Sequence, residues 1–264
     1  MPAPASKTTT AAGPRVRPVP AVTRSIAILR LLGKNPAPLP LKTIAQELGM
    51  VTSTCLHILR VLVEEGLVKA EAGTKRYSLG VGMLALARSV LESNPFPTLV
   101  QPVLDRLSEA WNVTTIGVEI RGADDLVVLA LAHSRSPFKL HVDVGSRFPA
   151  LTSATGRLVA AHAELSDAEL TRQFKTAQWE QAPDLETWKR EVEAVRRKGY
   201  SIDRGNYVSG ITIVAVPVLD SRSQMRFALV AAGMAEQLAA TKAQSLAKDL
   251  LQEAAALSQL LAAR

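Results

Sequence analysis

The chain has 264 residues, of which 47% are hydrophobic and 21% are charged. That composition is typical of a globular protein, and the length allows two domains that each hold a core. The single cysteine, Cys55, excludes an internal disulfide and any zinc site built on several cysteines. No apolar run reaches the roughly 20 residues that span a bilayer, and the first residues lack the apolar segment of a secretory signal, so we expect a cytoplasmic protein.

The net positive charge of the chain is confined to its first third. Residues 1–93 contain 12 Lys and Arg against five Asp and Glu, whereas residues 94–264 contain 19 of each. The formal net charge of +7 therefore belongs to a small N-terminal unit. Such a local field suits a polyanion, of which nucleic acid is the commonest, although a solvated basic surface without a partner would carry the same charge.

Residues 1–21 are rich in Pro, Ala and Thr and are expected to form a disordered basic arm. The arm carries Arg15 and Arg17, and Arg24 follows it closely. A flexible arm of this kind can reach a minor groove of DNA, or it can act only as a solubilising tail.

Residues 22–80 show the order helix, helix, tight turn, helix, hairpin. Apolar spacing predicts helices over Val22–Leu32, Lys42–Leu48 and Ser53–Glu65 and strands over Leu67–Ala70 and Arg76–Leu79. This order is typical of a winged helix-turn-helix DNA-binding domain.

Several local features of this domain can be predicted as well. In the first helix, Val22, Ile26, Leu29 and Leu32 should face inward. In the third helix, Cys55, Ile58, Leu59 and Leu62 should form the apolar stripe. Gly49 suits a left-handed C-cap of the second helix, and Thr52 or Ser53 can cap the third.

A further apolar helix over 81–94 should link this domain to residues 95–264, and its excess of apolar residues suggests packing both on its own domain and on a partner chain. The pattern that follows is that of an α+β domain: a mixed sheet flanked by helices. The elements expected in chain order are a helix at Pro102–Glu109, strands at Thr114–Ile120, Leu126–Ala132 and Lys139–Val144, helices at Ser153–Ala163, Asp167–Lys175 and Asp184–Lys198, strands at Tyr200–Asp203, Ile211–Leu219 and Arg226–Ala232, and a helix at Ala239–Leu261.

From Val22 onward the sequence resembles the IclR family of bacterial transcription regulators. The motifs that carry the resemblance are Arg24-Ser-Ile-Ala-Ile-Leu-Arg-Leu-Leu32, Ile44-Ala-Gln-Glu-Leu-Gly49, Ser53-Thr54, Glu64-Glu-Gly-Leu-Val68, Arg76-Tyr-Ser-Leu-Gly80, Val144-Gly-Ser-Arg-Phe-Pro149, Thr152-Ser-Ala-Thr-Gly156, Arg197-Lys-Gly-Tyr-Ser-Ile-Asp203 and Val214-Ala-Val-Pro217. The resemblance implies a winged-helix domain, a linker helix and a GAF-like effector-binding and oligomerisation domain, in dimers that often pair into tetramers on operator DNA.

Candidate DNA contacts lie on the outward side of the third helix and in the wing. A recognition helix presents its N-terminal and outward residues to the major groove, and a wing reaches phosphate or the minor groove. Arg60 can fork to a guanine edge or hold a phosphate. Ser53 and Thr54 can instead be plain caps, and His57 can be a surface histidine without a role. The complete candidate set is Arg24, Thr52, Ser53, Thr54, His57, Arg60, Lys75 and Arg76.

The resemblance also implies where an effector would bind, namely after Phe148-Pro149 and on two facing strands. Thr152 and Ser153 precede a helix, whose free N–H groups can hold a carboxylate, although a plain helix start would look the same. Relatives often have polar residues where this chain has Ile213, Val230 and Ala232, so we expect an aromatic carboxylic acid or a neutral aromatic metabolite. The candidate contacts are Thr152, Ser153, Ala154, Gly156, Asn206, Tyr207, Ile213, Val230 and Ala232, with Ala154 and Gly156 leaving room for the ligand and Tyr207 either stacking on it or lying in the core.

Catalytic and metal-binding motifs are missing from the sequence. The chain has no Gly-x-Ser-x-Gly elbow, P-loop or dinucleotide fingerprint, and His133 and His141 lack the carboxylates of a metal site. We therefore expect no enzymatic activity, no cofactor and no metal. The expected function is a ligand-responsive repressor of a catabolic operon. The alternative is an architectural DNA-binding protein whose C-terminal domain only oligomerises.

Overall fold

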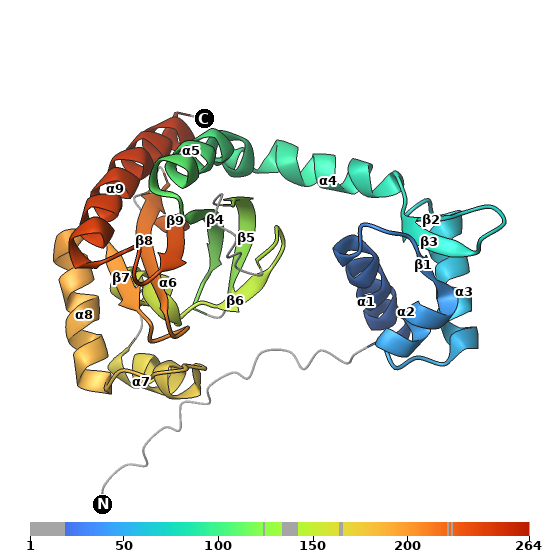
Figure 1. Cartoon of the computed structure of the whole chain (residues 1–264), viewed down its shortest axis with the longest axis horizontal. Coiled ribbons are helices and arrows are strands. Elements are labelled where there is room, and N and C mark those ends of the chain that lie inside the picture. The colour runs from blue at the N-terminus through green and yellow to red at the C-terminus, as the bar shows by residue number, and fades with distance from the viewer. Residues whose placement is uncertain are drawn as a thin grey trace, which may run out of the picture. The chain divides into compact units, whose positions relative to one another are not determined.

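The structure is a computed structural model that describes residues 19–123, 125–133, 142–163, 166–220, 222 and 224–263 (Figure 1). It divides into two compact units, Met1–Glu92 and Ser93–Arg264. Most of the expected arm, residues 1–18 with Arg15 and Arg17, lies outside the described residues. No helix among those described combines the length and the apolarity that crossing a bilayer requires.

The first unit has the expected winged helix-turn-helix order. Its elements are α1 (Pro20–Lys34), β1 (Leu39–Pro40), α2 (Leu41–Glu47), α3 (Thr52–Glu64), β2 (Val68–Ala70), β3 (Arg76–Leu79) and α4 (Gly82–Ser93). The three strands form an antiparallel sheet in the order β1-β3-β2, and β1 is the strand that the sequence did not predict. Its two residues adjoin the turn before α2, where a run of prolines hides a strand signal.

The core of this unit forms where the helices meet the hairpin. Ile28, Ile44, Cys55 and Leu59 are fully buried in it, and the burial of Cys55 and Leu59 confirms the apolar stripe of α3. Gly49 has φ +59°, as expected for a left-handed C-cap.

Two local expectations for these helices are wrong. Leu32 is buried as predicted, but Val22 and Ile26 are exposed, because α1 turns Ile28 to the core in their place. The N-cap of α3 is Val51 without a side-chain hydrogen bond, so neither Thr52 nor Ser53 caps the helix. The helix begins one residue earlier than expected, and both hydroxyls therefore stand in its first turn.

In the second unit a six-stranded antiparallel sheet is covered by helices on both faces, and the α+β class is confirmed. Its strands are β4 (Thr114–Arg121), β5 (Asp125–Ala132), β6 (Arg147–Pro149), β7 (Ser201–Arg204), β8 (Ile211–Leu219) and β9 (Met225–Met234), in the order β6-β5-β4-β9-β8-β7. Its helices are α5 (Phe96–Trp111), α6 (Ser153–His162), α7 (Asp167–Thr176), α8 (Leu185–Lys198) and α9 (Ala240–Ala262).

Alternation along the central strands separates two cores. In β9, Phe227, Leu229 and Ala231 face α5 and α9, whereas Ala228, Val230 and Ala232 face α6 and α8. Figure 1 shows α9 and α5 on one side of this sheet. The second face is the one that positions the candidate effector site.

Two further expectations in this unit need correction. Half of the expected strand Lys139–Val144 falls outside the described residues, its described half 142–144 is not a strand, and the edge strand is β6 instead. The helix expected from Pro102 begins earlier, at Phe96, as α5. Pro97 stands in its first turn, where the backbone N–H that proline lacks would have no intrahelical partner.

Candidate functional site

The recognition helix α3 presents a polar surface opposite its buried stripe. Thr52, Ser53, His57 and Arg60 are exposed, and Thr54 is half-buried. Burial raises the pKa of the Cys55 thiol on the opposite side, which keeps that side neutral and apolar. The helix therefore offers hydroxyl groups, an imidazole and a guanidinium on one face, as a groove reader needs.

The other candidate DNA contacts lie in the wing and on α1. Lys75 is exposed with φ +52°, and the structure places it in the turn between β2 and β3. Arg76 is exposed and donates to the carbonyl of Pro38 at 3.1 Å, so part of its guanidinium is already engaged. Arg24 is an exposed residue of α1. All these cations remain available for phosphate contacts.

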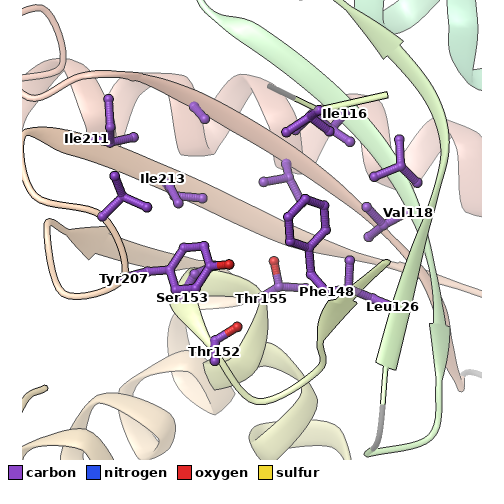
Figure 2. Close-up of a pocket in the computed structure, with 15 residues that line it drawn as sticks. Ile116, Val118, Leu126, Phe148, Thr152, Ser153, Thr155, Tyr207, Ile211 and Ile213 are labelled. Atoms are coloured by element: carbon purple, nitrogen blue, oxygen red, sulfur yellow. The ribbon is translucent and has the colours of Figure 1, made fainter. Parts of the chain in front are cut away.

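A cavity of about 100 Å³ lies between the sheet and the start of α6 in the second unit (Figure 2). Of the nine predicted effector contacts, six line it: Thr152, Ser153, Tyr207, Ile213, Val230 and Ala232. The remainder of the wall is largely apolar and comes from the strands β4, β5, β6 and β8, from α6 and from the segments before β6 and after β7. These further lining residues are Ile116, Val118, Leu126, Val128, Val142, Phe148, Thr155, Val208 and Ile211.

The polar groups gather at one end of this cavity. In Figure 2, Thr152, Ser153 and Thr155 come from the start of α6, and the Tyr207 ring lies beside them. No side chain caps the first turn of α6, and its leading N–H groups lack intrahelical acceptors. Burial raises the pKa of Tyr207, so its hydroxyl stays protonated at neutral pH and can donate a hydrogen bond.

Ser153 adopts φ +59°, a left-handed conformation that is uncommon for a residue other than glycine. The bend brings the chain into α6 directly after the turn at Pro149, where the Thr152 hydroxyl donates to the Pro149 carbonyl at 2.9 Å. Held backbone strain of this kind tends to occur at ligand sites.

The other three predicted contacts do not face the cavity. Ala154 packs in the core between α6 and the sheet. A Cβ on Gly156 would overlap the backbone of Leu151, so this glycine allows close packing of the chain and leaves no room for a ligand. Asn206 turns away to accept from Arg157 Nη2 at 2.9 Å and to donate to the carbonyl of Gln181. The small residues of this segment serve packing, which a sequence pattern cannot distinguish from ligand clearance.

The structure reveals a buried polar network behind the cavity that the sequence did not indicate. Arg157 is 1% exposed, and its guanidinium donates to Asp203 at 2.9 Å, to Glu191 at 2.6 Å and to the Ser153 carbonyl at 3.0 Å. Asp203 in turn accepts from the backbone N–H of Asn206 and Tyr207. One guanidinium thus fixes both the start of α6 and the loop that carries Tyr207.

Gly156→Ala should destabilise the second unit by about 1–3 kcal/mol, because the added methyl group meets backbone that cannot move aside. Denaturant titration followed by circular dichroism measures the effect. Gly33→Ala is the matched control: its Cβ would meet only Leu79 Cδ1, at 3.5 Å, in a helix that favours alanine. Equal stability of the two variants would contradict this role of Gly156.

Metal and histidine sites receive no support from the geometry. Within the described ranges, no three His, Cys, Asp or Glu side chains converge as metal ligands. His133 is exposed, and His141 lies outside those ranges.

Comparison with known proteins identifies both units. Residues 21–72 match the IclR helix-turn-helix domain, and residues 88–259 match the bacterial transcriptional regulator IclR C-terminal domain. A probable transcriptional regulator, SauR, from Cupriavidus necator is 27% identical over 213 residues, which cover 77% of this chain and 82% of that protein.

Solved structures agree with this assignment. The IclR transcriptional regulator from Alicyclobacillus acidocaldarius is 26% identical, with a TM-score of 0.72 over 92% of this chain and 99% of that one. An IclR homologue from Microbacterium hydrocarbonoxydans, solved with 4-hydroxybenzoate, is 16% identical with a TM-score of 0.74 over 91% of this chain and 98% of that one. These relatives are regulators and not enzymes, and the chain belongs to the IclR family of bacterial transcriptional regulators.

Proposed function

We propose that this DNA-binding regulator is a repressor of a catabolic operon and is released by a small aromatic carboxylic acid. The observation that carries the proposal is the cavity of Figure 2, whose wall is apolar except for one polar end. An aromatic ring suits the valine and isoleucine side chains, and a carboxylate suits the uncapped start of α6. The 4-hydroxybenzoate found in the Microbacterium homologue supports this ligand class.

Isothermal titration calorimetry of the full chain tests the ligand class with benzoate, 4-hydroxybenzoate and the neutral isostere benzamide. The acids should bind more tightly than benzamide if the helix start receives a carboxylate. Equal binding of all three would favour the neutral aromatic alternative. Failure of all three to bind would remove the aromatic proposal and leave the architectural alternative.

Ligand binding should also change DNA affinity. A ligand shifts the equilibrium between two DNA-binding poses only through unequal affinity for them. A coupling of about 1–3 kcal/mol corresponds to a roughly five- to 150-fold change in DNA affinity. Fluorescence anisotropy with DNA from upstream of the gene, with and without ligand, measures it, and a decrease in affinity would support repression relieved by the ligand.

Arg60→Ala should weaken specific DNA binding by about 1–3 kcal/mol if Arg60 reads a base. Arg60→Lys is the matched control, because lysine keeps the charge but loses the guanidinium fork. Base reading predicts that both variants lose specific affinity, whereas Arg60→Lys retains affinity for random DNA. If Arg60→Lys binds the specific site as well as the parent, Arg60 contacts phosphate only.

The linker helix supports a further proposal, that the chain forms a homodimer or homotetramer. No residue of α4 is buried, which corrects the expectation that it packs on its own domain. Leu84 is 69% exposed, Leu86 57% and Val90 62%, and such an apolar helix surface needs a partner. A two-fold dimer would also match a palindromic operator.

Light scattering at micromolar concentration should therefore give the mass of a dimer or a tetramer. Leu84→Glu combined with Leu91→Glu places two charges seven residues apart on one side of α4 and should shift the mass towards the monomer. Ser89→Glu, an exposed polar position of the same helix, should leave the mass unchanged. A monomeric parent protein would refute the proposal.

A further inference from the structure

A second cavity, of about 220 Å³, opens in the C-terminal unit beside the edge strand β7 and is separate from the proposed effector site. Its wall comes from α6, α8, β7 and the beginning of α9, and none of the residues lining the apolar cavity lines this one. The polar and charged side chains in the wall are Arg157, Glu191, Lys198, Tyr200, Ser201, Arg204 and Gln244. In contrast to the apolar cavity, this one offers mostly polar and charged groups.

Ser201 is the first indication that this cavity holds a ligand. The residue is 2% exposed, and its hydroxyl oxygen has no hydrogen-bond partner among the described residues. Ser201 lies two residues before Asp203, so both side chains point to the same face of the sheet. On that face the Arg157 guanidinium donates a hydrogen bond to Asp203. Leaving a buried hydroxyl unpaired is destabilising, and a bound polar ligand would relieve that cost.

The charges of the wall indicate the ligand class. Glu191 and Asp203 are both engaged by Arg157. Lys198 and Arg204 are exposed at the rim, and within the described part of the chain neither makes an ion pair or a hydrogen bond that would hold its charge. The wall carries the positive charges of Arg157, Lys198 and Arg204 and the negative charge of Glu191, and Asp203 lies behind it. Three positive charges against two negative ones leave a surplus positive charge.

The helix ends beside the cavity do not cancel this positive charge. The last turn of α8 brings the negative end of its dipole near Lys198, but that turn carries three cations, Arg196, Arg197 and Lys198. Gln244 belongs to the first turns of α9, whose N-cap has no side-chain hydrogen bond. Because Gln244 lines the cavity, the positive end of α9 lies near it.

We infer that this cavity is a second ligand site, specific for a small oxyanion such as a phosphate or carboxylate group, with Ser201 in its wall and Lys198 and Arg204 at its rim beside the edge strand β7. Arg157 makes the site capable of regulation, because the same guanidinium that lines it also bonds the Ser153 carbonyl at the effector cavity. An oxyanion that attracts the Arg157 guanidinium would change its hydrogen bond to Ser153, and with it the start of α6, without occupying the effector cavity.

Calorimetry of the full chain with inorganic phosphate and, separately, with malonate tests the site at constant ionic strength. Lys198→Gln and Arg204→Gln should each weaken binding by about fivefold or more, because each removes a charge-assisted hydrogen bond. Arg197→Gln is the matched control, because it removes the same charge from the neighbouring position of α8 but does not line the cavity. Phosphate held by the DNA-binding unit would be unaffected by all three variants, so only the difference between Lys198→Gln and Arg197→Gln counts.

A thiol introduced by Ser201→Cys provides an independent readout. Cys55 packs in the apolar core of the first unit, whereas position 201, although 2% exposed, lines the cavity, so methyl methanethiosulfonate should label the introduced thiol faster than Cys55. The parent protein, which has Cys55 alone, gives the background rate. The introduced thiol should react, and phosphate or malonate should slow the reaction by about fivefold or more, because a bound ligand shields the thiol. The inference is overturned if neither anion binds, if the three glutamine variants bind equally, or if the anions leave the labelling rate of the Ser201→Cys variant unchanged.

Discussion

Replacing Arg157 with Met is expected to lower the free energy of unfolding of the C-terminal unit by about 3–5 kcal/mol. The substitution leaves Asp203, which is fully buried, without its counter-charge. It also removes the donor that joins the start of α6 to the Tyr207 loop. All three tryptophans of the chain, Trp111, Trp179 and Trp188, lie in this unit, so denaturant titration followed by tryptophan fluorescence reports on it alone.

A double variant separates the unpaired charge from lost packing. Arg157→Met combined with Asp203→Asn removes both charges while keeping an oxygen for the loop N–H groups, and should lose less stability than Arg157→Met alone. Arg196→Met, which removes an exposed arginine of α8, should change stability by about 0.5 kcal/mol or less. A loss below about 1 kcal/mol for Arg157→Met would show that the network does not hold this part of the fold.

Local sequence patterns predicted most elements of the fold because those elements depend on periodicity. The apolar stripe of α3, the alternation of β8 and β9 and the long apolar pattern of α9 all lie within the segment that forms the element. The predictions were wrong where only a few residues determine whether an element forms or which of its faces is buried. The two-residue strand β1 has no period to read, and α1 has enough apolar residues to support two different inward faces.

The candidate site was predictable only in part, because it depends on which strands become neighbours. The family pattern pointed to Ile213, Val230 and Ala232, which line the cavity, whereas Ile116 and Val128 reach it because β4 pairs with both β9 and β5. No local pattern specifies that order. Arg157 was missed for a related reason: its partner Asp203 is 46 residues away along the chain, and an arginine on a helix is usually exposed.

Ala232→Asp is expected to abolish effector binding while leaving DNA binding intact. Ala232 is 4% exposed, lines the apolar cavity and pairs with Ile213 across β8 and β9. An unpaired carboxylate there meets an apolar wall and repels the carboxylate of an acid ligand. Calorimetry with 4-hydroxybenzoate should show no binding, and the ligand should no longer change DNA affinity in fluorescence anisotropy.

Two companion variants distinguish a blocked cavity from a damaged fold. Ala232→Leu fills the same space without a charge and should also weaken ligand binding. Ala235→Asp places a carboxylate three residues further along, at an exposed position, and should bind the ligand as the parent does. If Ala232→Asp folds and binds the ligand as tightly as the parent, the effector lies elsewhere in the protein. Because Ala232 is absent from the wall of the oxyanion cavity, phosphate binding there should survive in every folded variant of this series, and that result would show that the two cavities are separate sites.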